Sequence, residues 1–138
     1  MRAAAIGVAL AGLGIATYLT VVHYTGGQPV CAVAHGCATV QASDYAKLGG
    51  VPVALLGVLG YLGLLAALIV DGENGRGAAA FLSLGGLGFS VWLTYVEVGI
   101  LDAICIWCVG SAICMALLAA FTTARMLRSP PLAPVRAR

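Results

Sequence analysis

The chain has 138 residues, of which 62% are hydrophobic and only 9% are charged, whereas soluble domains carry about 25% charged residues. The formal net charge of +2 gives no polybasic surface, so no nucleic-acid partner is expected. The length allows one domain, and apolar runs that repeatedly reach about 20 residues, enough to cross a bilayer, argue against a soluble core. The composition therefore predicts an all-α integral membrane protein in contact with membrane lipid.

The apolar runs predict a bundle of four transmembrane helices. The expected spans cover about 3–24, 51–70, 78–98 and 104–124. We expect residues 1–128 to form this membrane domain and residues 129–138 to form a basic, Pro-rich tail. A signal peptide has an apolar region of about 7 to 15 residues and a small-residue cleavage site. The first run is longer and ends in Val21-Val22-His23-Tyr24, so we expect an uncleaved span.

Basic residues are distributed unevenly among the predicted loops. If both termini and the turn after the second span share one side, six of the seven basic residues lie there. They are Arg2, Arg76, Arg125, Arg128, Arg136 and Arg138, and only Lys47 lies opposite. Cytoplasmic loops carry an excess of Lys and Arg, so this pattern predicts two cytoplasmic termini. The first loop and the start of the fourth span then face the periplasm or the exterior.

The stretch from Gly26 to Gly50 is the long polar loop, and we expect a short interfacial helix over residues 42–48. It contains Cys31 and Cys37, with glycines nearby that favour a mobile loop. Mobility suits a pair that shuttles electrons, because thiol–disulfide exchange needs contact between the exchanging sulfurs. The alternative is that this pair is a static staple of the loop.

A second pair, in the sequence Cys105-Ile-Trp-Cys108, opens the fourth predicted span. With Asp102 as the N-cap, both sulfurs would share one face of the first helical turn, where partial positive charge stabilises a thiolate. The alternatives are a static disulfide and a zinc site completed by Cys31, Cys37 or His35. We expect no metal, because a closed zinc site gives no reason to place the pair on a membrane helix.

Other polar and aromatic residues have simpler interpretations. Cys114 lies within the apolar length of the fourth span and is expected to be structural. Glu97 and Asp102 flank the short outer connection, where carboxylates are usually solvated, although either is placed for proton transfer. The aromatic side chains at the outer ends of the last two spans favour an interfacial belt over stacking on a quinone. They are Trp92, Tyr95 and Trp107.

Taken together, these residues resemble the vitamin K epoxide reductase family, in its short bacterial members without a fused thioredoxin-like domain. The resemblance reaches to about Arg128. It rests on two loop cysteines, a Ser six residues after the second of them, and a C-x-x-C pair at the start of the fourth span. Here these are Cys31, Cys37, Ser43, Cys105 and Cys108. The runs 50–57, 93–97 and 103–108 are also similar to family motifs.

The resemblance implies an enzyme of the bacterial inner membrane that supports disulfide formation. A periplasmic thioredoxin-like (DsbA-like) dithiol protein would pass electrons to Cys31, and from Cys37 they would reach Cys105. Cys108 would then reduce a quinone of the menaquinone, ubiquinone or vitamin K type, in a pocket bounded by Ser43. Animal members have a quinone-contacting Tyr four residues after the second active-site Cys, where this chain has Ala112. Reduction of the vitamin epoxide is therefore not implied.

Two other classes of protein share parts of this pattern. Another four-helix disulfide oxidase architecture carries its C-x-x-C pair at the end of the first span and a widely spaced pair in the second outer loop. The order is reversed here. A disulfide-stapled bundle with a structural or transporter-accessory role is the non-catalytic alternative, and it predicts that the redox state of the cysteines has no effect.

Overall fold

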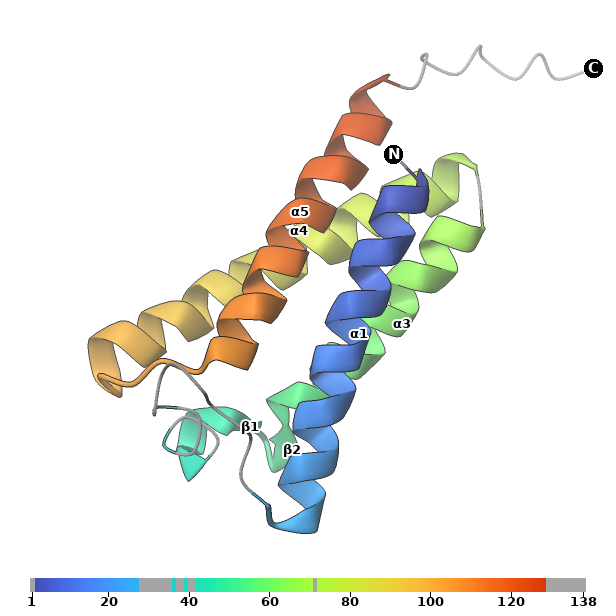
Figure 1. Cartoon of the computed structure of the whole chain (residues 1–138). Coiled ribbons are helices and arrows are strands. Elements are labelled where there is room, and N and C mark those ends of the chain that lie inside the picture. Colours follow the sequence, from blue (N-terminus) through green and yellow to red (C-terminus); the bar gives the residue numbers. More distant parts are fainter. Residues whose placement is uncertain (1, 28–35, 37–38, 40–41, 71, 129–138) are drawn as a thin grey trace, which may run out of the picture.

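Long apolar helices dominate the computed structural model, which describes residues 2–27, 36, 39, 42–70 and 72–128. The helices are α1 (Arg2–Thr25), α3 (Val53–Ile69), α4 (Glu73–Tyr95) and α5 (Ile106–Arg128). A five-residue π-helical turn, η2 (Val96–Ile100), extends α4. Figure 1 shows the helices running alternately up and down. The predicted all-α architecture is confirmed for the described residues, apart from one small hairpin.

Three of these helices are long and apolar enough to cross a membrane, counting α4 together with η2. Helix α3 is also apolar but has only 17 residues, at the short end of the range for a span. Several bulky apolar side chains point outward, such as Phe81 and Leu127, which are 77% and 80% exposed. This is the arrangement expected of helices that face lipid. The protein is a multi-pass membrane protein, and the count of four spans stays a prediction.

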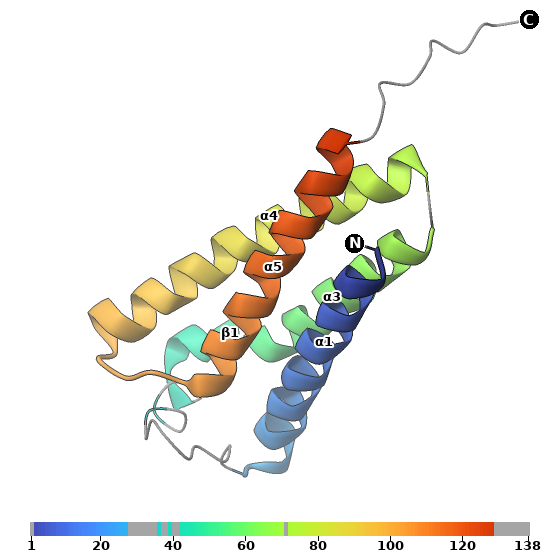
Figure 2. The ribbon, with the colours of Figure 1, turned by 45° about the horizontal axis from the view of Figure 1, so that its top comes forward.

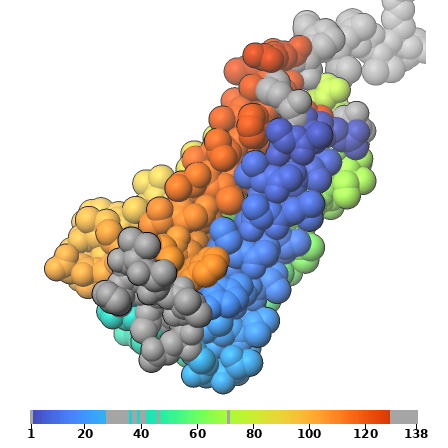
Figure 3. Space-filling model, viewed as in Figure 1, coloured from blue at the N-terminus to red at the C-terminus, as the bar shows by residue number. Residues whose placement is uncertain are grey.

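Each helix packs against two others in a closed ring. Helix α1 packs between α3 and α5, and α4 completes the ring between the same two helices. Figure 2 shows the same order from a second direction, and the space-filling view in Figure 3 shows α1 and α5 lying side by side. Small residues of α1 allow this packing, because a side chain at Gly12 would overlap the ring of Tyr61. The bundle interior is therefore shaped by these close helix contacts.

The polar loop leads into α3 through a 3-10 turn that is followed by a short hairpin. The turn η1 (Asp44–Ala46) is a 3-10 helix, and β1 (Lys47–Leu48) pairs antiparallel with β2 (Val51–Pro52). The predicted interfacial helix over 42–48 is therefore wrong at Lys47 and Leu48, which are extended. Gly49 and Gly50 both have positive φ, 61° and 84°, as a tight hairpin turn requires. A Gly-Gly pair favours such a turn, although the sequence analysis did not predict the hairpin.

The two ends of the bundle differ in charge. Helix α1 begins, α3 ends, α4 begins and α5 ends at one end of the molecule (Figure 1). The Arg2 side chain binds there, with its Nε donating to the carbonyl of Leu68 at 2.9 Å and a terminal nitrogen donating to Ile69 at 3.0 Å. A cation at the C-terminus of a helix satisfies carbonyls that have no helical partner. The hairpin and the start of α5 lie at the other end.

Candidate functional site

Cys105 lies immediately before α5 and acts as its N-terminal cap. Its carbonyl accepts the first helical hydrogen bond, from the Val109 N–H at 3.0 Å. Its sulfur accepts hydrogen bonds from the N–H groups of Trp107 and Cys108, the second and third residues of the helix. The predicted cap, Asp102, is wrong, because that residue is exposed, has φ 49° and lies four residues before the helix begins.

The capping position of Cys105 favours its thiolate. The pKa of Cys105 is lowered from 9.0 to about 7, first by a hydrogen bond from the Cys108 thiol and then by the N–H groups of Cys108 and Trp107. Burial and the nearby Glu97 carboxylate oppose this effect. The net effect lowers the pKa of Cys105 and so favours its thiolate, which is the nucleophilic form.

The alkylation rate of Cys105 in the reduced protein should therefore rise through a midpoint near pH 7, because the thiolate is the form that reacts. The rate is measured against pH by mass spectrometry of the Cys105 peptide. In Cys108→Ala the midpoint should move to higher pH, because the strongest hydrogen-bond donor is lost. A midpoint that stays near 7 in this variant would show that the cap alone lowers the pKa.

Cys105 and Cys108 face different surroundings, although they are one helical turn apart. Both are free thiols, and Cys105 is completely buried. Cys108 lines a large cavity in the bundle, whereas Cys105 does not. The Cys108 thiol lies within hydrogen-bonding reach of both the Cys105 sulfur and the Glu97 carboxylate. The Cys108 sulfur therefore faces the cavity, and the Cys105 sulfur lies behind it, away from the cavity.

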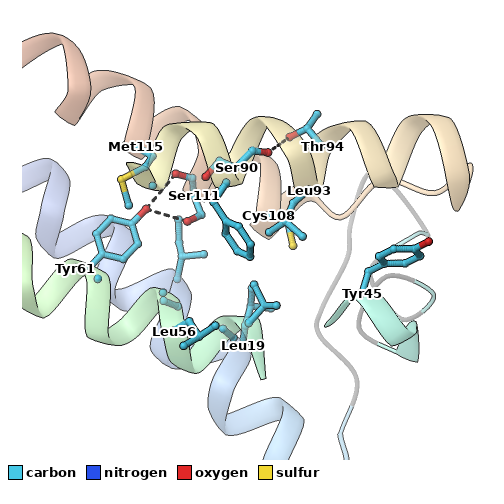
Figure 4. A pocket seen from close by; sticks show the side chains of 18 of the residues that line it. Leu19, Tyr45, Leu56, Tyr61, Ser90, Leu93, Thr94, Cys108, Ser111 and Met115 are labelled. Atoms are coloured by element: carbon cyan, nitrogen blue, oxygen red, sulfur yellow. Dashed lines mark hydrogen bonds between the residues drawn. The ribbon is translucent and has the colours of Figure 1, made fainter. Parts of the chain in front are cut away.

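The cavity has a volume of about 340 Å³ and is open enough to admit an apolar ring. All the long helices contribute to it, together with Ser43 and Tyr45 from the polar loop. Figure 4 shows Cys108 between Tyr45, toward the hairpin end, and Tyr61 and Met115, deeper in the bundle. The wall is mostly aliphatic and aromatic, with a few polar groups. They are Ser43, Tyr45, Tyr61, Ser90, Thr94, Glu97, Cys108 and Ser111.

The deep end of the cavity carries a polar pair that the sequence did not indicate. The Tyr61 hydroxyl lies 2.8 Å from the Ser111 hydroxyl and 3.0 Å from the Ser111 carbonyl oxygen. Tyr61 is 1% exposed, and within an apolar span it has the appearance of an ordinary core aromatic. Sequence patterns do not show that α3 and α5 bring these two residues together.

Aromatic residues near the hairpin end pack on one another beside the cavity. Trp107 packs on Tyr18 of α1 with ring centroids 4.8 Å apart. Trp92 packs on Phe89 and Tyr45, at 5.7 and 6.1 Å. Trp92, Tyr95 and Trp107 do not line the cavity, and their role in an interfacial belt stays a prediction. Phe89 and Tyr45 are the aromatic rings that line it near this end.

The chain matches the model of the vitamin K epoxide reductase family over residues 3–123. It belongs to the vitamin K epoxide reductase family. Members of this family are in general quinone-coupled thiol oxidoreductases of membranes. The resemblance inferred from the cysteine and Ser spacing is thereby confirmed, and so is the general oxidoreductase class.

Within this vitamin K epoxide reductase homologue, Ser43 and Cys108 line the same cavity, and Cys105 and Cys108 lie together. Ala112, where animal members have a Tyr, does not line the cavity, but its neighbour Ser111 does. Cys31, His35 and Cys37 lie outside the described residues. Among the residues that the structure does describe, no group of three potential metal ligands is found. The zinc alternative involving the loop is therefore untested.

Gly36 is the one described residue of the loop between its two cysteines. It packs closely on Ile104, two residues before α5 begins. A Cβ added at Gly36 would lie 2.5 Å from the backbone N and O of Ile104. Such a distance is far below van der Waals contact, so only glycine fits there without a shift. Gly36 directly precedes Cys37 in the sequence, and Ile104 directly precedes Cys105. Gly36 and Ile104 therefore approach each other closely at their backbones.

Proposed function

We propose that this protein is a quinone-dependent thiol oxidoreductase that supports disulfide formation outside the cytoplasm. Electrons pass from a thioredoxin-like dithiol protein to Cys31 and Cys37, then to Cys105 and Cys108, and finally to a membrane quinone. The observation that carries the proposal is the placement of Cys108 on the wall of an apolar cavity, hydrogen-bonded to a Cys105 of lowered pKa. A structural staple has no need of such a cavity.

The residues around the cavity fit a quinone head group. A volume of about 340 Å³ and an apolar wall suit a flat ring, and the few hydroxyl groups suit its carbonyl oxygens. Ser111 at the deep end and Ser43 near the hairpin bring hydroxyl groups to the wall for these oxygens, and Tyr61 holds the Ser111 hydroxyl and carbonyl in place. A bound quinone supplies the acceptor for two electrons and two protons. Menaquinone, ubiquinone and vitamin K types share this ring.

The loop pair is proposed to reach Cys105 rather than Cys108. Cys105 is buried away from the cavity, and Ile104 beside it contacts Gly36, the neighbour of Cys37. This contact supports transfer from Cys37 to Cys105, with Cys31 left to meet the partner. Exchange between the pairs proceeds through a mixed disulfide, in which the attacking and attacked sulfurs touch.

Replacing Gly36 with Ala should slow electron transfer between the two pairs by about 10- to 100-fold, because the added Cβ pushes the loop away from Ile104. The measurement is the rate at which a reduced dithiol partner reduces the Cys105–Cys108 disulfide. Gly27→Ala is the matched control, since a Cβ there would make only an ordinary 3.6 Å contact. Equal rates for both variants would exclude Gly36 as the point of approach.

The proposed orientation places the redox end of the bundle outside the cytoplasm. Arg2, Arg76 and Arg128 belong to helix ends at the opposite pole, which supports a cytoplasmic location for that pole. In bacteria this corresponds to the inner membrane, with the partner in the periplasm. Labelling of single cysteines introduced near each pole in intact cells tests this orientation.

The function is tested with purified protein in lipid nanodiscs, supplied with a reduced thioredoxin-like partner and a soluble quinone analogue. We expect the quinone to be reduced as the partner forms its disulfide, in equal molar amounts. The order of the steps is tested by trapping the mixed disulfide with the partner. The Cys37→Ala variant should accumulate a mixed disulfide between the partner and Cys31. If the partner is instead trapped by Cys37 in Cys31→Ala, the proposed order is reversed.

A further inference from the structure

Glu97 is a buried carboxylate at the boundary between the cysteine pair and the cavity. It lies on the π-helical turn η2, is 3% exposed and lines the cavity together with Cys108. A π-helical turn is uncommon and is often found at functional sites. An ionised carboxylate in such an apolar place is costly unless it receives hydrogen bonds or exchanges its charge for a proton.

The contacts of Glu97 connect it to both cysteines. Its Oε2 accepts the Cys105 N–H at 3.1 Å, and its carboxylate accepts a hydrogen bond from the Cys108 thiol. Within the described part of the chain these are the groups that act on it, and neither is a cation. Since a thiol has a single proton, Cys108 donates either to Glu97 or to Cys105 at any moment. The Cys108 proton therefore has two alternative acceptors.

We propose that Glu97 is a catalytic residue that takes the proton of the Cys108 thiol and releases it into the cavity when the quinone is reduced. This inference rests on the proposed function and assigns a proton path to it. Transfer from thiol to carboxylate breaks the S–H bond, forms an O–H bond and leaves the site with the same net charge. The number of negative charges in the buried site therefore stays the same when the Cys108 thiolate forms.

The electrons and protons balance in this path. The Cys105 and Cys108 sulfurs form one S–S bond and lose two electrons, which the quinone accepts. One proton leaves Cys108 through Glu97 and enters the cavity. The second is the proton that the Cys105 thiol gives up as the S–S bond forms. Where Cys105 is already a thiolate, solvent that reaches the open cavity supplies this proton instead. Reduction of the quinone consumes both protons.

Asp102, the other carboxylate of this connection, does not have these contacts. It is exposed and does not line the cavity. Its positive φ of 49° is one that Asn tolerates as well as Asp. Asp102→Asn is therefore a matched control. It also replaces a carboxylate with an amide, five residues from Glu97, but it leaves the carboxylate that lines the cavity in place.

The test compares Glu97→Gln with Asp102→Asn in the fully reduced protein. The Gln oxygen still accepts the Cys105 N–H but does not take up a proton. We expect single-turnover quinone reduction to slow by about 100-fold or more in Glu97→Gln. In the absence of quinone, alkylation of Cys108 at neutral pH should be at least as fast as in the wild type, because a negative charge beside the thiol is removed. Asp102→Asn should match the wild type in both measurements.

A Glu97→Gln variant within about twofold of the wild-type quinone rate would overturn the proposal, as would equal slowing of alkylation and quinone reduction. The Glu97→Asp variant serves as a second test in case the Gln variant misfolds. It keeps a carboxylate that accepts a proton but shortens the side chain. It should reduce quinone faster than Glu97→Gln, and a slower rate would show that shape rather than proton transfer matters. If the wild type itself fails to reduce quinone, the proposed function fails instead.

Discussion

Replacing Cys108 with Ser is expected to abolish quinone reduction, with a loss on the order of 1,000-fold or more. Cys108 is the cysteine of the pair that lines the cavity, and a hydroxyl does not form the disulfide that releases electrons to the quinone. The rate is measured by the absorbance change of a quinone analogue, in protein reduced beforehand so that the loop and the partner are not needed.

The same variant should retain the thiol half of the reaction. Cys105 stays a nucleophile, so Cys108→Ser is expected to accumulate a mixed disulfide between Cys105 and a loop cysteine, visible by mass spectrometry. Cys114→Ala is the control, because that cysteine is also free but packs in the core away from the cavity. Quinone reduction that survives in Cys108→Ser, or is lost in Cys114→Ala, would contradict the assigned role of Cys108.

A bulky side chain placed in the cavity should weaken quinone binding and leave the thiol chemistry of Cys105 and Cys108 unchanged. Gly60 lines the cavity, and a Cβ added there would meet no atom within 4 Å, so the ring of Gly60→Phe has space to enter it. We expect the KM for quinone to rise by about 10- to 100-fold, because the ring occupies part of the binding volume. The measurement is the initial rate against quinone concentration in nanodiscs.

The companion variant is Gly88→Phe on α4. Gly88 also has no atom within 4 Å of an added Cβ, but it does not line the cavity. Its KM should equal that of the wild type, and both variants should form the Cys105–Cys108 disulfide normally with a chemical oxidant. An unchanged KM in Gly60→Phe would mean that the quinone binds elsewhere, and a shift shared with Gly88→Phe would point to a general disturbance of the helices.

Local patterns predicted much of this protein correctly. The apolar runs identified the helices because a run of about 20 apolar residues is long enough to cross a bilayer as a helix, whatever its neighbours are. Element ends were less certain: α4 begins at Glu73 rather than 78, and α5 begins at Ile106 rather than 104. The second difference has a physical cause, since Cys105 itself caps the helix that Asp102 was expected to cap. The hairpin was missed although Gly49-Gly50 is a recognised signal for it.

The sequence by itself determined the membrane class, the family and the position of Cys105 and Cys108 at a helix start, because these depend on residue type and spacing along one chain. Only the tertiary structure decided that Cys108 meets a cavity while Cys105 does not, and that Glu97 is buried against both. The same holds for Tyr61 and Ser111, which are 50 residues apart in sequence. A carboxylate near a predicted loop is expected to be solvated, and the burial of Glu97 depends on how the π-helical turn packs against the segment that carries Cys105 and Cys108.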